Sequence, residues 1–180
     1  MSLRRRILIP VDLSFNSLRA VRVGRDLASV MSEITLFYAI DAEERRIANL
    51  SRFGPSTVGS LNGLLADRIN RLRQIRRAEL PDTRSVILAI CVGEDAAEVI
   101  CNGAKRNEAD MIVITAHGRG NHPDRVPGHV AAAVAHRAPC PVMVVRGYDV
   151  AEPLGITGSI SSPGSLSSAG ALERTGTTAY

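Results

Sequence analysis

The sequence predicts an α/β fold with an open, doubly wound sheet of five parallel strands and helices on both faces. Hydrophobic residues make up 45% of the chain but aromatic residues only 3%, so Val, Ile, Leu and Ala must build the core. Five short apolar runs show no polar alternation, which is typical of strands buried on both faces. Segments with helical periodicity separate the runs and are long enough to join parallel strands.

The first two strands and the first helix are expected in the N-terminal part of the chain. ILIPV, residues 7–11, ends at polar residues that favour turns. Apolar residues recur every three or four positions over residues 18–31, which predicts an amphipathic helix. ITLFYAI, residues 34–40, is rich in residues that favour strands. The polar connection over residues 41–60 shows neither period, and we assign no element to it.

Three more helices and three more strands follow. Residues 61–80 predict a helix with apolar residues on one side and arginines largely on the other, stopped by Pro81. SVILAICV (85–92) is the third strand, and Asp95 is the expected N-cap of a helix that ends near Asn107. MIVITA (111–116) is the fourth strand, residues 128–137 form an Ala-rich helix, and PVMVV (141–145) is the fifth strand.

The domain is expected to span residues 1–148, followed by a tail over residues 149–180. More than half of the last thirty residues are Gly, Ser, Thr or Pro, and few are charged. Such a segment buries too little apolar area to offset about 1 to 2 kcal/mol of backbone entropy per residue. We expect the tail to be disordered.

Composition excludes several classes of partner. The formal net charge is only +4, and a chain with three Phe, three Tyr and no Trp has few rings on which bases stack, so we expect no nucleic-acid binding. No apolar run reaches the eighteen or more residues of a membrane span. The three cysteines have no CxxC spacing, which argues against a disulfide framework or a zinc site and favours a reducing cytoplasm.

The loop between the fourth strand and the last helix has the composition of a phosphate cradle. In doubly wound sheets the ligand lies beyond the carboxyl ends of the strands. The first amides of a helix beginning at Gly128 have no partners within the helix and attract anions. Gly118 and Gly120 allow close backbone approach, and Arg119 adds positive charge. Turn geometry alone is the alternative reason for the glycines. The Walker and GxGxxG patterns are absent.

The four histidines do not form a recognisable metal site. His129 and His136 are separated by two helical turns, a rise of about 10 Å, and no acidic or thiol ligand accompanies His117 and His122 at a known spacing. We expect no metal site here. His117 either shapes the loop or contacts the ligand.

Several stretches together resemble the universal stress protein family over roughly residues 3–147. They are ILIPVDLSFNS (7–17), VGEDAAEVI (92–100), ADMIVITAHGR (109–119) and HRAPCPVMVV (136–145). The resemblance implies a five-stranded parallel sheet of order 3-2-1-4-5, a homodimer, frequent ATP binding, and a role in stress survival or in regulating partner proteins.

The ATP-binding members of this family carry Gly, two residues, Gly, nine residues, and then Gly followed by Ser or Thr. Gly118 and Gly128 match this spacing, whereas Thr115 replaces the first Gly and His129 replaces the final Ser or Thr. The resemblance places Val11 and Ile40 at adenine, Asp12 beside the ribose, and Val92 and Gly93 after the third strand. The loop and the start of the last helix supply the remaining candidate ligand residues: His117, Gly118, Arg119, Gly120, Gly128, His129 and Val130.

The two departures are expected to weaken binding. If the first motif position needs a positive φ, a threonine there costs about 1 to 2 kcal/mol, and a lost hydroxyl costs about as much. Together they would move a micromolar site to roughly 0.1 to 1 mM. His129 either donates to a phosphate or fills its space. Asp12 has its own alternative role as a cap for the next helix, although Ser14 or Asn16 would also serve.

Three functional hypotheses follow. The first is a regulator that binds ATP with Mg²⁺, or another adenine nucleotide, at the rim of the sheet. The second is the same scaffold with no nucleotide, acting through protein contacts. The third, a slow ATPase, lacks a catalytic constellation, and we expect no enzyme. The apolar fifth strand lies at the edge of the sheet, so we expect a homodimer through it.

Overall fold

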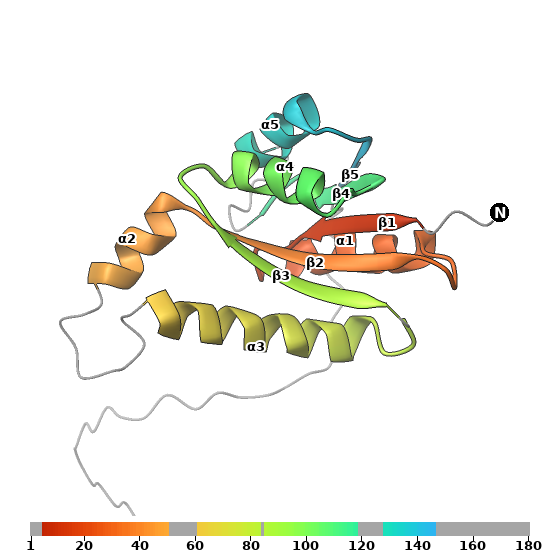
Figure 1. Ribbon diagram of the computed structural model, residues 1–180, viewed down its shortest axis with the longest axis horizontal. Helices are drawn as coiled ribbons and strands as arrows, with labels where there is room; N and C mark the ends of the chain where they lie inside the picture. Colours follow the sequence, from red (N-terminus) through yellow and green to blue (C-terminus); the bar gives the residue numbers. More distant parts are fainter. Residues whose placement is uncertain (1–4, 51–60, 84, 119–127, 147–180) are drawn as a thin grey trace, which may run out of the picture. The chain divides into compact units, whose positions relative to one another are not determined.

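The computed structural model describes residues 5–50, 61–83, 85–118 and 128–146. These ranges contain a sheet of five parallel strands in the order β3-β2-β1-β4-β5, which confirms the predicted fold class and strand order (Figure 1). The strands are β1 (Arg6–Pro10), β2 (Glu33–Ile40), β3 (Val86–Val92), β4 (Met111–Thr115) and β5 (Val142–Val145). The helices are α1 (Phe15–Leu27), α2 (Ala42–Leu50), α3 (Leu61–Glu79), α4 (Ala96–Arg106) and α5 (His129–Arg137).

Helices cover both faces of the sheet, as predicted (Figure 1). One face of β1 and β2 packs against α1 and α3, through residues such as Ile9, Val21 and Leu72. The other face packs against α4 and α5, through residues such as Leu8, Phe37 and Val134. Because both faces of the central strands are buried, their sequences carry no polar alternation. None of the helices in the described ranges is long and apolar enough to cross a bilayer.

The strand order reverses direction at β1, and this reversal leaves a crevice beyond the carboxyl ends of β1 and β4. The chain runs from β1 to β2 and β3 on one side, and β4 and β5 lie on the other side of β1. β1 therefore has β2 on one side and β4 on the other. The chain leaves β1 toward α1 on one face of the sheet and leaves β4 toward α5 on the opposite face. This is the switch point at which doubly wound sheets bind ligands.

Helix α2 is the element that the sequence did not predict. Its sequence AEERRIANL is short and has few apolar residues, and its Ile47 side chain is exposed. Local capping and tertiary ion pairs stabilise it instead. Asp41 accepts a hydrogen bond from the Glu44 amide at 2.8 Å, and Glu44 is bound by Arg68 of α3.

Three predicted features lie outside the described residues. They are Arg119 and Gly120 of the phosphate loop, and the disordered tail expected over residues 149–180.

Candidate functional site

A pocket of about 470 Å³ lies at the carboxyl ends of β1, β2 and β4, where the strand order changes. Its volume is within the range usual for small-molecule sites, about 300 to 1,000 Å³. The ends of the three strands and the first turns of α2, α4 and α5 supply its wall. The lining residues are Pro10, Val11, Asp12, Ser17, Tyr38, Ala39, Asp41, Glu43, Glu44, Ala96, Ile100, Ile114, Thr115, Ala116, His117, Gly118, Gly128, His129, Val130 and Ala131.

The turn after β1 holds Asp12 in a fixed orientation. Its Oδ1 accepts hydrogen bonds from the Ser14 amide at 3.0 Å and from the Ser14 hydroxyl at 2.5 Å. Ser14, not Asp12, is the N-cap of α1, with its side chain accepting from the Ser17 amide. Leu13 between them has a φ of 65°, a left-handed conformation that costs about 1 to 2 kcal/mol for a residue with a Cβ. The hydrogen bonds of Asp12 help to offset that cost.

Gly118 brings the end of β4 against the end of β1. A Cβ on residue 118 would overlap Asp12 Oδ2, and the φ of Gly118 is not left-handed. A glycine at position 118 therefore leaves room for the Asp12 carboxylate. The two strand ends that the sequence placed at one rim do meet there.

The N-terminus of α5 forms part of the pocket wall, and its first amides have no partner within the helix. Gly128 is its N-cap and supplies no side-chain hydrogen bond. The Gly128 amide donates to Ala116 O at 2.7 Å, and the first intrahelical bond runs from Ala132 N to Gly128 O. The amides of His129, Val130 and Ala131 precede that bond, and all three residues line the pocket. Such amides and the positive end of the helix dipole favour an anion.

At the end of the pocket away from α5, β2 extends further than β1, so the last backbone groups of β2 have no described strand beside them on that side. Phe37 O accepts from Val11 N, whereas Ile40 O accepts from Gly93 N of the β3 side. Since backbone groups alternate between the two neighbouring strands, those of Ala39 point to the side of β1, which has already ended at Pro10. Ala39 lines the pocket there.

Two residues that the family resemblance placed at adenine or near it lie away from this pocket. Ile40 is fully buried in the core between the sheet and α1 and α3, and its backbone pairs with β3. Val92 is exposed at the end of β3, with β2 between it and β1. Neither lines the pocket, whereas Ala39 does. Val11 does line it and is buried.

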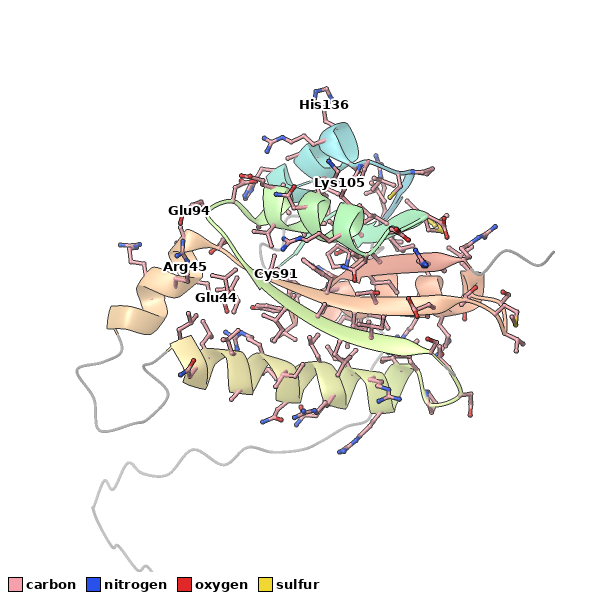
Figure 2. The ribbon with its side chains drawn as sticks, in the orientation of Figure 1. Glu44, Arg45, Cys91, Glu94, Lys105 and His136 are labelled. Carbon is pink, nitrogen blue, oxygen red and sulfur yellow. The ribbon has the colours of Figure 1, made fainter. Side chains whose placement is uncertain are left out.

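An ionic cluster that the sequence did not indicate forms the α2 side of the pocket. The Tyr38 hydroxyl donates to Glu44 at 2.9 Å, and Arg68 Nε donates to the same carboxylate at 2.8 Å. The Arg68 guanidinium also lies 5.4 Å from the centre of the Tyr38 ring. Glu44 is labelled on α2 in Figure 2. Its place in the first turn of α2, a helix that the sequence did not predict, explains why no sequence pattern pointed to Glu44.

The two departures from the glycine motif have different consequences. Thr115 is the last residue of β4 and pairs in register with Val145. Among the described non-glycine residues, only Leu13 and Glu108 have a positive φ, so Thr115 carries no backbone strain and the expected penalty does not arise. His129 is the first residue of α5, exposed and at the pocket wall. Because His129 replaces the Ser or Thr of the motif, the pocket lacks that hydroxyl beside the first amides of α5.

The described residues contain no group of three His, Cys, Asp or Glu side chains arranged to hold a metal ion. His117 lines the pocket beside Gly118, and His136 lies near the far end of α5. His122 lies outside the described residues.

The family model of the universal stress proteins matches residues 3–146. The chain belongs to the universal stress protein family. This finding confirms the resemblance that the sequence motifs indicated. The match extends over the whole described sheet and over both walls of the pocket.

Three solved structures have a fold similar to that of this chain. The protein MJ0577, the subject of a structure-based assignment of biochemical function, is 26% identical with a TM-score of 0.68, over 81% of this chain and 97% of its own. UspA from Lactobacillus plantarum is 26% identical with a TM-score of 0.56, over 81% and 100%. The universal stress protein from Archaeoglobus fulgidus, solved with dAMP, is 17% identical with a TM-score of 0.56, over 80% and 98%.

Proposed function

We propose that this universal stress protein binds ATP with Mg²⁺, or another adenine nucleotide, and acts as a regulator in the stress response. The observation that carries the proposal is the pocket at the switch point, with the first amides of α5 at one end and, among the described residues, an open strand edge at the other. Structures of similar fold solved with dAMP, cAMP and AMP support an adenine nucleotide as the ligand.

The base would occupy the β2 end of the pocket. The backbone N–H and C=O of Ala39 offer a donor and an acceptor to the edge of a planar ring, and adenine presents both an acceptor nitrogen and an amino donor. Val11 supplies an apolar contact for the ring face. Asp12 lies between the two ends, where its carboxylate would accept from a ribose hydroxyl.

The phosphates would occupy the α5 end. The amides of His129, Val130 and Ala131 would donate to phosphate oxygens, and a ring N–H of His129 would add a further hydrogen bond. Asp12 is the pocket carboxylate placed closest to this end, and it fits Mg²⁺ as an oxygen ligand. When bound, Mg²⁺ would neutralise charge on the triphosphate. The amides of α5 would orient the phosphates, and Ser14 would hold Asp12.

Binding is expected to be stronger than the sequence alone suggested. Because Thr115 is unstrained, only the lost hydroxyl at position 129 remains, at about 1 to 1.5 kcal/mol. That loss is about tenfold, which moves a micromolar site to roughly 10 μM. Cellular ATP would occupy such a site.

The second candidate is the same scaffold without a nucleotide, acting through protein contacts. The identities of residues 115 and 129 favour it, because both depart from the ATP-binding pattern at the pocket wall. In neither case does the chain act as an enzyme in this proposal: Asp12 is held by the Ser14 amide and hydroxyl, and its proposed role is to bind and orient the nucleotide. The three thiols are free, which fits the proposed cytoplasmic location.

Calorimetric titration of ATP with Mg²⁺ into the purified protein tests the proposal. Wild type is expected to bind with a dissociation constant near 10 μM, and Thr115→Gly/His129→Ser is expected to bind about tenfold more tightly. Heat from the double variant alone would favour the nucleotide-free scaffold. Absence of binding in both would remove the proposed site.

We also propose that two copies associate through β5. This strand is a sheet edge of four residues, with Met143 exposed. Pairing across a two-fold axis would satisfy its outer backbone groups. Sedimentation equilibrium at micromolar concentration is expected to give the dimer mass, and a monomer mass would contradict this interface.

A further inference from the structure

The second edge of the sheet, strand β3, leaves half of its backbone groups facing outward. Ile34 N donates to Ser85 O, and Gly93 N donates to Ile40 O, so the odd-numbered residues of this strand pair with β2. The N–H and C=O groups of the even-numbered residues therefore point away from the sheet. We call these groups the β3 edge; they belong to Val86, Leu88, Ile90 and Val92. Figure 1 looks onto this edge, and no described element lies in front of it.

The β3 edge lacks the features that usually protect a sheet edge. The strand has seven residues, VILAICV, with no proline and no charge. Ile87 and Val92 are 39% and 41% exposed. By contrast, β5 has four residues and follows Pro141. A long, apolar, uncharged edge is a template for pairing with another extended chain.

Helix α3 places a row of arginines beside this edge. Taking buried Leu72 as the reference and about 100° per residue, Arg76, Arg73 and Arg77 lie at about 40°, 100° and 140° in one direction. We call these three residues the basic flank. Arg68 and Glu79 are displaced in the other direction. Their partners are Glu44 of α2 and Arg22 of α1.

That geometry fixes which way the basic flank faces. The partners of Arg68 and Glu79 lie on the side of β2 and α1, toward the middle of the sheet. Since α3 packs beneath β2 and β3, the opposite side of the helix faces outward past the β3 edge (Figure 1). All three arginines of the basic flank are exposed.

The charges of the basic flank are not neutralised within the described residues. Arg73 donates to Asn70, and no ion pair involves any of the three. On the other side of the same helix, Arg71 pairs with Asp67, and Arg68 pairs with Glu44. Within the part of the chain that the structure describes, an open strand edge and a row of arginines without ion pairs thus lie next to each other.

We propose that the β3 edge and the basic flank together bind an extended acidic peptide segment of a partner protein as a sixth strand. Main-chain hydrogen bonds to the even-numbered residues of β3 would provide affinity. Because side chains alternate along a strand, acidic residues would project toward α3 and its basic flank, and apolar residues would project to the other face, beside exposed Ile87. The segment therefore alternates acidic and apolar residues.

A second copy of this chain fits the surface less well. Pairing two β3 edges across a two-fold axis would set two basic flanks side by side, and like charges oppose such an association. A nucleic acid would use the basic flank but not the backbone groups of the edge. The charge complementarity and the free hydrogen-bonding groups together favour an acidic peptide.

Fluorescence anisotropy with a synthetic probe tests the proposal. The probe is a fluorescein-labelled octapeptide of alternating Glu and Val, with two controls, the alternating Lys and Val peptide and a Glu and Val peptide N-methylated at every backbone nitrogen. We expect the Glu peptide to bind and both controls to bind at least tenfold more weakly. Equal binding of the N-methylated peptide, which has no backbone N–H to donate on either edge, would overturn the proposal.

Charge reversal on α3 gives a matched comparison within the protein. Arg73→Glu/Arg76→Glu/Arg77→Glu is expected to weaken the Glu peptide at least tenfold, because three contacts become repulsive. Arg71→Glu, on the other side of the same helix, is expected to change affinity less than twofold. Both variants are compared by urea unfolding to confirm that they fold. Equal effects of the two variants would overturn the proposal.

Amide hydrogen exchange on the wild-type chain locates the bound peptide and needs no variant. Peptide binding is expected to slow exchange at Leu88 and Ile90, whose N–H groups face outward, and to leave the interior amides of Ile87 and Ala89 unchanged. Slowed exchange at Leu88 and Ile90 that depends on protein concentration, without peptide, would show a second copy on the edge and would overturn the proposal. Tighter binding of duplex DNA than of the peptide would also overturn it.

Discussion

Replacing Gly118 by alanine tests how the ends of β1 and β4 meet. A Cβ at this position overlaps Asp12 Oδ2, so the carboxylate must move. Its other oxygen is held by the Ser14 amide and hydroxyl. Moving the group sacrifices one or both of these bonds, each with a net value of about 0.5 to 1.5 kcal/mol. Gly118→Ala is therefore expected to lower the free energy of unfolding by about 1 to 2 kcal/mol.

A double-mutant cycle with Asp12→Ala isolates this contact. With Asp12 truncated, the added methyl group meets no carboxylate, so Gly118→Ala is expected to cost less than about 0.5 kcal/mol in that background. Urea unfolding of the four proteins measures the coupling. Gly128→Ala serves as the spatial control, because its Cβ would lie 3.4 Å from Ala116 O, an ordinary contact. An equal cost of Gly118→Ala in both backgrounds would refute the proposed contact between the two strand ends.

Three further predictions concern the caps, the ion pairs and the core. Gly128→Ser should raise the free energy of unfolding by a few tenths to about 1 kcal/mol, because a serine side chain caps α5. The same variant should bind ATP more weakly in calorimetry, because the hydroxyl would accept a hydrogen bond from an amide that is proposed to bind phosphate. A rise in both stability and ATP affinity would contradict the proposed phosphate site. Hydrogen bonding to Arg22 lowers the pKa of Glu79, so the pair stabilises the fold above the ordinary pKa of glutamate and loses that contribution as the pH falls through the lowered value. The stability difference between wild type and Glu79→Gln in urea should therefore be constant near neutral pH and shrink below about pH 4; a pH-independent difference would show that the ion pair is not responsible. Gly103→Ala should destabilise by about 1 to 2 kcal/mol in the same assay, because overlap with the Phe37 ring outweighs the gain in helix propensity, and a stabilised variant would mean that α4 shifts freely on the sheet.

The fold was predictable from sequence because the signals that define it are local and strong. Each of the five apolar runs became a strand, and each periodic segment became a helix. Helix α2 was missed for a physical reason: its stability comes from the Asp41 cap and from Glu44 binding Arg68, a residue on another helix. A sequence pattern does not show a contact between segments that are distant along the chain.

The pocket was predictable in outline but not residue by residue. The rim of the sheet, Asp12, Gly118 and the start of α5 were placed from strand ends and glycine spacing. The choice between Ala39 and Ile40 was not available, because a strand buried on both faces has no alternation to reveal which residue turns toward the pocket. A threonine at position 115 was expected to cost binding free energy if that motif position needs a positive φ, but the strand geometry there is regular.

The central claim is that the pocket between β1, β2, β4 and the start of α5 is where the adenine nucleotide binds. Amide chemical-shift mapping during titration with ATP and Mg²⁺ tests it most directly. The account predicts the largest shifts at the amides of His129, Val130 and Ala131 and at Ala39. Saturable shifts confined to other surfaces, with these four amides unmoved, would contradict it.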